Sequence, residues 1–319
     1  MQLFTRLMVL IYKLGGNSID KRSVLFIIVG ASLWGTIGIF VQGLYEFGLT
    51  PLQVVTVRVF FAAIIILIFL LIKNPSLLKI KIKDFKYFIG TGILSIVFFN
   101  WFFFTAIQET SLSVAAILLY TGPAFVTIIS RFTFKEYLTP QKLLALLFTL
   151  IGCVLVIGLF PLEQTRLSLY GVVVGIGSGF CYALYSIFGK YALAKYHSQT
   201  VTAYTFIFAS VALLPISGLW KIDNLLTTTP IWAYGISLGL FPTVLAYFLY
   251  TKGLEKVETS KASITATIEP VVAALIGIFI FGDLLTSWQF IGIFIVLSAV
   301  IFMAAPSKDK KYLYPVKTF

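Results

Sequence analysis

Ten long runs of apolar residues follow one another along the chain, and short polar or charged segments separate them. Each run has about 20 residues, enough for an α-helix to cross a hydrocarbon core of roughly 30 Å. The runs lack the alternation of polar and apolar positions that membrane-spanning strands require. We therefore predict an all-α membrane protein with ten transmembrane helices, at residues 24–43, 51–72, 87–107, 112–130, 141–160, 169–189, 199–219, 231–251, 261–281 and 287–304.

A repeat divides the ten segments into two halves. It appears when the chain is shifted against itself by 147 residues, which we call the repeat shift. Glycine, proline and acidic positions carry the match, because apolar residues coincide by chance too often to count. The matched pairs are Gly30 with Gly177, Gly92 with Gly239, Pro123 with Pro270, and Glu136 with Asp283.

Each half then holds five helices, so the second half enters the membrane from the opposite side. Such inverted repeats are common in transporters, since the two halves can pack in two similar ways, each open to one side. We predict a cytoplasmic leader at 1–22, a first five-helix repeat at 24–160, a second at 169–304 and a cytoplasmic tail at 305–319.

The charge distribution predicts the orientation. The chain carries 24 Lys and Arg against 12 Asp and Glu. Almost all of its basic residues fall on the side of the N-terminus; Arg166 and Lys221 fall opposite, and Arg58 lies within a span. Positive residues mark cytoplasmic loops, so both termini are expected in the cytoplasm of a bacterial cell, with the protein in the plasma membrane. No basic soluble domain is present, so nucleic-acid binding is not expected.

Enzyme chemistry has little support in the sequence. The single histidine, His197, falls in a loop, and we find no metal-ligand cluster, no nucleophile with a nearby base and no phosphate-binding glycine loop. We therefore expect no catalytic residues, no metal site, no cofactor and no enzyme activity.

Two charged residues, Arg58 and Glu269, lie well inside predicted spans. An ionised group at the bilayer centre costs about 2.5–3.5 kcal/mol, so such groups usually face a cavity or a partner. Their expected depths differ by about 8 Å, which side chains, water or a substrate could bridge. Each charge occurs in one half only, which favours a specific task. The alternatives are a protonated Glu269 bonded to a neighbouring helix and an Arg58 that reaches the surface.

Polar groups at mid-depth are the other candidates for a substrate cavity. Their tips need hydrogen-bond partners, although such residues also serve as ordinary core or lipid-facing side chains. The candidates are Trp34, Asn100, Tyr120, Tyr182, Tyr185 and Tyr247.

Pro123 and Pro270 fall mid-helix at equivalent positions, where a proline bends a helix and frees a carbonyl. With Gly122 they are candidate gating points, and fixed packing kinks are the alternative. Glu136 and Asp283 come just before predicted helix starts, which indicates a structural role. Because these acids are duplicated near opposite membrane faces, a role in capping helices or latching gates stays open.

The chain resembles the EamA-type branch of the drug/metabolite transporter superfamily. The resemblance rests on I-E-P-V-V-A-A-L-I-G-I-F-I-F-G-D (268–283), on T-G-P-A-F-V-T-I-I-S-R-F-T-F-K-E (121–136) and on G-A-S-L-W-G (30–35). It implies a ten-helix carrier of amino acids, other metabolites or drugs, often an exporter, with a central cavity and peripheral fifth and tenth helices. The chain departs from the pattern at Gly122, where the first half has no acid before its proline.

These observations predict a secondary transporter that moves a small amphipathic metabolite across the plasma membrane by alternating access, with export as the expected direction. The substrate could be an amino acid, a carboxylate or a drug-like compound. Its partners would be that small molecule, membrane lipid and, if transport is proton-linked, protons. A non-transporting membrane scaffold or receptor is the alternative. The predicted site comprises Trp34, Arg58, Asn100, Tyr120, Tyr182, Tyr185, Tyr247 and Glu269.

Overall fold

The computed structural model describes residues 18–158, 168–221 and 229–304, and all regular structure within them is helical. In this part of the chain, nine helical segments are long and apolar enough to cross a membrane. The predicted span 141–160 is instead a shorter apolar helix, α9 (Pro140–Val156), of 17 residues. At about 1.5 Å per residue it is roughly 26 Å long, less than a hydrocarbon core of about 30 Å.

Several spans of the first half are built from more than one helical segment. The connection between the second and third spans holds two short 3₁₀ turns, η1 (Pro75–Leu78) and η2 (Ile82–Asp84). The spans are α2 (Ser18–Gly35) with α3 (Ile37–Glu46); α4 (Pro51–Lys73); α5 (Phe85–Phe88) with the π-helical segment η3 (Ile89–Val97) and α6 (Phe98–Glu109); α7 (Leu112–Leu119) with α8 (Gly122–Thr133); and α9.

The second half follows the same order. The predicted tail 305–319, most of the predicted leader and Arg166 lie outside the described residues. The spans are α10 (Leu169–Leu193); α11 (Ser198–Ser217) followed by the turn η4 (Leu219–Lys221); α12 (Thr229–Gly239) with the π-helical segment η5 (Leu240–Leu245) and α13 (Ala246–Leu254); α14 (Thr259–Thr265) with α15 (Ile268–Ile276) and the π-helical segment η6 (Gly277–Phe281); and α16 (Ser287–Ala304).

Hydroxyl side chains begin several of these helices. The Thr50 hydroxyl accepts a hydrogen bond from the Gln53 amide, and the Gln53 side chain accepts one from the Thr50 amide, which forms a capping box at the start of α4. The Thr139 hydroxyl caps α9 by accepting from the Lys142 amide, directly before Pro140. Both are helix starts that a local sequence pattern predicts.

The fourth span of each half is broken at nearly equivalent points. A two-residue turn separates α7 from α8, and another separates α14 from α15. Pro123 and Pro270 therefore lie in the first turn of a new helix, where the missing backbone N–H costs little. The predicted position of these prolines inside continuous, bent helices was therefore wrong. The third spans also match, since η3 and η5 supply a π-helical segment in each.

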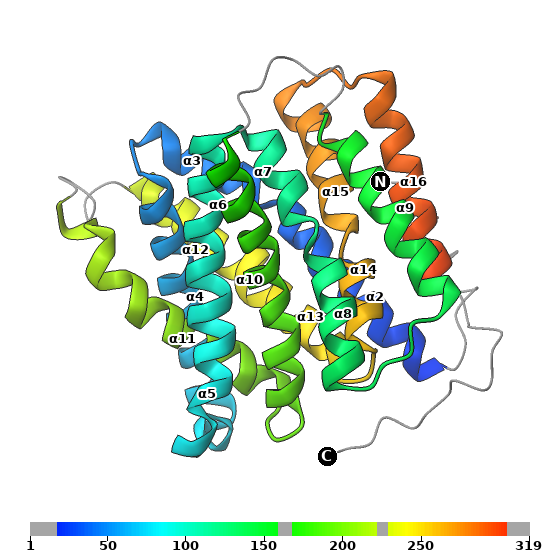
Figure 1. Cartoon of the computed structure of the whole chain (residues 1–319). Helices are drawn as coiled ribbons and strands as arrows, with labels where there is room; N and C mark the ends of the chain where they lie inside the picture. Colours follow the sequence, from blue (N-terminus) through cyan, green and yellow to red (C-terminus); the bar gives the residue numbers. More distant parts are fainter. Residues whose placement is uncertain (1–17, 159–167, 222–228, 305–319) are drawn as a thin grey trace.

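The bundle has a central helix and a peripheral pair (Figure 1). Helix α10 packs against α6, α7 and α8, while α2 packs against α13 and α15. Helices α9 and α16 pack against each other at one edge. We call the side on which α2 begins the N side and the opposite side the far side. The helix crossings place segments of both halves around one buried region.

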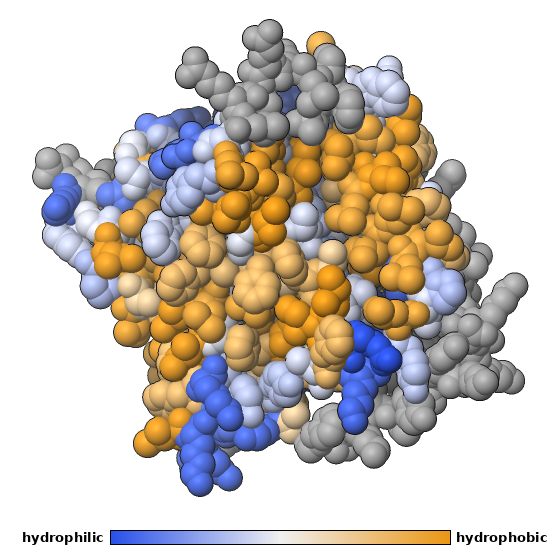
Figure 2. All heavy atoms as spheres, in the orientation of Figure 1, coloured by the Kyte–Doolittle hydropathy of each residue, from blue (hydrophilic) through white to orange (hydrophobic). Residues whose placement is uncertain are grey.

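The outer surface suits a hydrocarbon environment. Figure 2 shows hydrophobic residues across the middle of one face, with hydrophilic residues gathered toward its ends. Large apolar side chains such as Ile72, Phe279 and Phe294 are mostly exposed on the helices. A soluble protein seldom exposes so large a continuous apolar surface. With the nine apolar spans, this surface establishes a multi-pass membrane protein.

Candidate functional site

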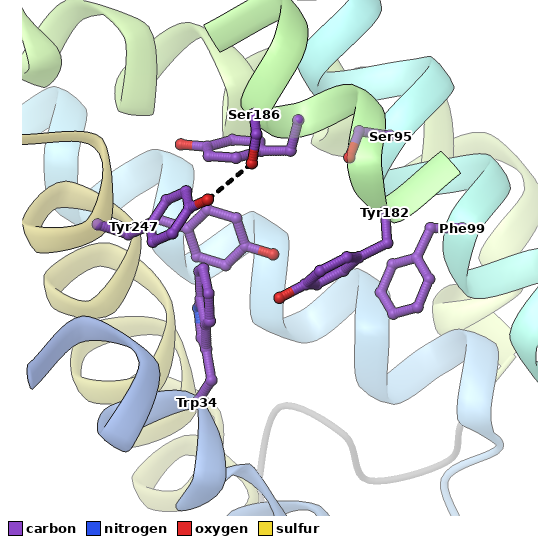
Figure 3. A pocket seen from close by; sticks show the side chains of 8 residues that line it. Trp34, Ser95, Phe99, Tyr182, Ser186 and Tyr247 are labelled. Carbon is purple, nitrogen blue, oxygen red and sulfur yellow. Dashed lines mark hydrogen bonds between the residues drawn. The ribbon is translucent and has the colours of Figure 1, made fainter. Parts of the chain in front are cut away.

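A pocket lies where helices of the two halves meet (Figure 3). The space between its atoms is about 270 Å³, including the part open to solvent. The enclosed part of this space has room for about one water molecule, so binding of a solute needs the pocket to open further. Its lining residues come from α2, η3, α6, α10 and α13, and they are Trp34, Ser95, Phe99, Tyr182, Tyr185, Ser186, Tyr247 and Tyr250.

Aromatic rings form most of the pocket wall. The Trp34 and Tyr247 ring centroids are 4.9 Å apart at an interplanar angle of 65°, and the Trp34 and Tyr182 centroids are 6.4 Å apart. The Tyr185 ring meets the Tyr247 ring nearly at a right angle, with centroids 4.9 Å apart. Edge-to-face contacts of this kind are favourable and hold each ring in place. Figure 3 shows Trp34 and Tyr182 approaching the pocket from different helices.

Hydroxyl pairs tie α10 to α13 behind the rings. The Tyr185 hydroxyl lies 2.5 Å from the Thr251 Oγ1, and the Ser186 Oγ lies 2.7 Å from the Tyr250 hydroxyl. Buried hydroxyls without partners would each be costly, so these pairs stabilise the contact between the helices. By contrast, the indole Nε1 of Trp34 is buried without a hydrogen-bond partner among the described residues. It is a donor left free beside the pocket.

Arg58 is buried in the membrane-spanning part of α4, with 7% of its surface exposed. Its Nε and Nη2 have no hydrogen-bond partner within the described ranges. Its neighbours Val55 and Val59 belong to the same apolar core as the pocket residue Tyr247. Burying an unpaired guanidinium costs several kcal/mol, so this arrangement calls for an anionic partner.

Glu269 occupies the first turn of α15, directly after the break in the span. Its side chain is partly exposed and makes no hydrogen bond or ion pair with any residue that the structure describes. It lies within electrostatic reach of Arg58, Tyr120 and Tyr182 without forming an ion pair with Arg58. The two unpaired groups of opposite sign therefore lie within electrostatic reach of each other and of tyrosines that line the pocket.

Small residues let α2 and α8 approach this region closely. A Cβ at Gly35, next to Trp34, would lie 2.8 Å from the Glu269 carbonyl oxygen. A Cβ at Gly122 would lie 2.9 Å from the Tyr182 ring. The first contact brings the Trp34 segment onto α15. The second explains why the first half has glycine at the position that Glu269 occupies in the second.

The structure brings together four of the eight predicted site residues at the pocket: Trp34, Tyr182, Tyr185 and Tyr247. Tyr120 is buried and within electrostatic reach of Glu269 and Tyr182, as Arg58 is of Tyr247 and Glu269. Asn100 does not line the pocket, because its Nδ2 donates to the Ile96 carbonyl of its own span at 2.7 Å. A local bond to the helix satisfies its amide.

Sequence reasoning missed four lining residues: Ser95, Phe99, Ser186 and Tyr250. Ser186 and Tyr250 follow predicted site residues at helical spacing, one turn after Tyr182 and three residues after Tyr247, so the pattern contained a usable signal. Ser95 lies in the π-helical segment η3, whose altered turn changes the face that each residue occupies. No feature of the sequence predicted that change.

A model of the EamA-like transporter family matches the chain twice, at residues 21–158 and 169–305. The chain belongs to the EamA-like transporter family. The two matches together cover most of this EamA-like protein, and they divide it between α9 and α10.

Curated relatives of the EamA-like protein are also named as transporters. An uncharacterized transporter of Archaeoglobus fulgidus is 31% identical over 86% of this chain and 93% of its own length. The uncharacterized transporter YwfM of Bacillus subtilis is 28% identical over 90% of this chain and 95% of its own length. The threonine/homoserine exporter RhtA of Salmonella typhimurium is 27% identical over 65% of this chain and 67% of its own length.

A solved structure titled "Crystal structure of protein" has the same fold, with a TM-score of 0.73. The structural match covers 88% of this chain and 95% of the solved chain, at 17% sequence identity. At that identity the likeness concerns the fold alone. The family match and the names of the relatives support a membrane transporter.

Proposed function

We propose that this EamA-like protein is a secondary transporter that moves a small amphipathic metabolite across the plasma membrane by alternating access. Its ten helices would form two inverted five-helix repeats, 24–160 and 169–304, with both termini in the cytoplasm. The paired breaks in the fourth spans and the paired π-helical segments support this repeat. The pocket between elements of both halves supports a site that either half could uncover.

The unpaired guanidinium of Arg58 is the observation that carries the proposal. A buried cation with free Nε and Nη2 donors suits an anionic group of the substrate, which would accept their hydrogen bonds. Glu269, partly exposed and without a partner among the described residues, would bind a substrate ammonium or a proton. The rings of Trp34, Tyr182 and Tyr247 would hold the apolar part between them.

The unpaired groups Arg58 and Glu269 favour a small substrate that carries both an anionic and a cationic group. Amino acids carry a carboxylate for Arg58 and an ammonium for Glu269, and the relative RhtA is named as a threonine/homoserine exporter. We therefore favour an amino acid or a related carboxylate as the substrate, with export as the direction.

A flux assay in proteoliposomes tests the proposal. Vesicles containing the purified protein are loaded with single amino acids, and exchange with external radiolabelled solute is measured. We expect exchange of at least one amino acid by the wild type and its loss in Arg58→Ala and Glu269→Gln. Arg131→Ala and Glu46→Gln, which alter exposed charges outside the site, serve as matched controls and should exchange normally.

Two results would contradict the proposal. Unchanged exchange in both site variants would remove the site assignment. No exchange of any amino acid, carboxylate or small amphipathic solute by the wild type would favour the alternative, a membrane scaffold or receptor that transports nothing.

A further inference from the structure

Glu136 joins the two halves on the N side. Its carboxylate accepts hydrogen bonds from the Thr259 amide at 2.6 Å, from the Ser260 amide at 3.1 Å and from the Ser260 hydroxyl. These donors belong to the first turn of α14, where backbone amides have no partner within the helix. Lys142 lies 3.7 Å from the same carboxylate. Glu136 is buried, so this contact fastens the end of the first half's fourth span to the start of the second half's.

A distinctive backbone motif places Glu136 there. The residue before it, Lys135, is the one non-glycine residue with positive φ in the described ranges, at 57°. The Glu136 amide then donates back to the Ser130 carbonyl at 3.3 Å. A left-handed residue just after the last helical turn is a common way to end a helix and turn the chain away.

The repeat shift places the same motif on the far side. Gly282, equivalent to Lys135, has φ 75°, and the Asp283 amide donates to the Gly277 carbonyl at 3.0 Å, again spanning six positions. Asp283 thus ends η6 as Glu136 ends α8. Yet its side chain is exposed and has no hydrogen bond or ion pair with the residues that the structure describes.

The repeat shift also identifies a docking point for Asp283. It aligns Thr259 and Ser260 with Leu112 and Ser113, the first two residues of α7. The first-turn amides of α7 have no acceptor within the helix, and the Ser111 hydroxyl accepts only that of Val114 among them. The Leu112 side chain is 63% exposed, so this end of α7 is open to an approaching group. The far side therefore holds both parts of the contact that is closed on the N side.

We propose that Asp283 is the far-side counterpart of Glu136, and that the two carboxylates alternate as latches. With the N side closed, Glu136 holds α14 and Asp283 is free. With the far side closed, Asp283 takes the Leu112 and Ser113 amides and the Ser113 hydroxyl, and Glu136 releases α14. The inference rests on the alternating access proposed above and assigns it two named contacts.

The two latches differ in strength. Lys142, which supports Glu136, aligns with Gln289, which has no charge and already accepts hydrogen bonds from Thr286 and donates one to the Val156 carbonyl. A neutral partner adds less to a carboxylate contact than a buried cation does. We therefore expect the empty carrier to favour the closed N side, as the structure has it.

Spin-label distances in the full-length protein in liposomes test the latches. One pair of labels, at Leu169 and Leu284, reports the far side, and a second pair, at Phe132 and Lys256, reports the N side. All four positions are exposed. Cys153 and Cys181, which are buried, are replaced by alanine so that no other site reacts.

We expect one dominant population in the wild type, with the far side open. Glu136→Gln should add a population with a shorter far-side and a longer N-side distance, raised on the order of tenfold because hydrogen bonds to a charged group are lost. Asp283→Asn in the Glu136→Gln background should remove that population again. Glu46→Gln, an exposed far-side acid changed in the same background, should leave it. Ser260→Ala, which removes one donor only, gives a smaller shift of the same kind if Glu136→Gln does not fold.

The latch proposal fails if Glu136→Gln and Ser260→Ala leave both distances unchanged, or if Asp283→Asn leaves the new population intact. The flux assay on the same variants separates this failure from that of the proposed function. If the label distances change as predicted but no solute is exchanged, the latches are supported and the transport function is contradicted. If solute is exchanged but neither acid affects the distances, the transport function is supported and the latches are contradicted.

Discussion

The two halves of the chain share a backbone plan but differ at a few polar positions. Arg58 of the first half aligns with Thr205 of the second, and Glu269 of the second aligns with Gly122 of the first. Thr205 is satisfied, since its Oγ1 lies 2.7 Å from the Thr91 Oγ1 and 2.8 Å from the Val201 carbonyl. Gly122 lies at a close approach to α10 that leaves no room for a side chain. By contrast, Arg58 Nε and Nη2 and the Glu269 side chain have no hydrogen-bond partner among the described residues.

This difference distinguishes residues that build the shared fold from residues that serve a specific function. Where both halves need the same shape, they carry equivalent breaks, π-helical segments and left-handed turns. The two charges that lie well inside predicted spans, Arg58 and Glu269, each occur in one half only, and neither forms an ion pair among the described residues. An unsatisfied group in a buried place is costly, so its presence indicates a use outside the resting fold. Four changes break or sharpen the comparison, in order of expected effect.

Replacing Arg58 by the residue of the other half, Arg58→Thr, should have the largest effect. Exchange should fall at least about 30-fold, the scale of losing one partner of a buried charged contact. Thermal stability should stay level or rise, because an unpaired buried charge is removed. Exchange rates and melting curves of the same preparation check both parts. A variant that melts earlier and still transports would make Arg58 structural.

Filling the matching glycine position tests packing. In Gly122→Ala the new Cβ would meet the Tyr182 ring at 2.9 Å and the Gly179 carbonyl at 3.2 Å. Overpacking of this kind costs about 1–3 kcal/mol of stability. Gly38→Ala is the control, since a Cβ there would have no neighbour within 4 Å. Equal unfolding free energies for the two variants would contradict a close contact at Gly122.

Acid should release the N-side latch. Burial raises the pKa of the Glu136 carboxyl. The charge of Lys142 and the hydrogen bonds from Ser260 and Thr259 together lower it by more, so the pKa lies below its usual value of 4.5. The ionised latch is therefore complete above pH 4.5, and it is lost as the pH falls through the lower folded pKa. The other charged groups near the latch are Lys190 and Glu258.

The N-side label distance checks this prediction. It should stay constant from neutral pH down to 4.5 and lengthen below that value. In Glu136→Gln the same range should show no such transition. A transition of equal size in both proteins would assign it to another carboxylate.

The smallest effect is expected from Thr205→Val. It keeps the side-chain shape and removes a hydroxyl that serves the contact with Thr91, so stability should fall by about 1 kcal/mol. Exchange should match the wild type within about twofold, because Thr205 has its partners within the fold. Together with Arg58→Thr, this pair of variants measures the same repeat position in both halves. A transport defect in Thr205→Val would remove the distinction drawn between them.

Much of this arrangement could be predicted from the sequence, because hydrophobic length and repeated Gly, Pro and acidic positions are local signals. They placed most of the helices and singled out Arg58 and Glu269 as charges inside the spans. They could not show that α9 is short, or that Pro123 and Pro270 begin new helices. Those outcomes depend on where the backbone breaks its hydrogen bonds.

Long-range pairings were also beyond the sequence. Asn100 was a reasonable candidate until its bond to the Ile96 carbonyl appeared, and Ser95 was hidden by the π-helical turn that carries it. The contact between Glu136 and α14 joins residues more than a hundred positions apart. Only the folded structure shows that Glu136, and not the equivalent Asp283, is hydrogen-bonded to a helix of the other half.

A binding measurement with matched ligands tests the central claim most directly. Purified wild type and Arg58→Thr are heated with an amino acid or with its amide, which lacks the carboxylate. We predict that the acid raises the melting temperature of the wild type, that the amide does so far less, and that Arg58→Thr removes the difference. Equal stabilisation by acid and amide, or an unchanged preference in Arg58→Thr, would contradict a substrate anion held by Arg58.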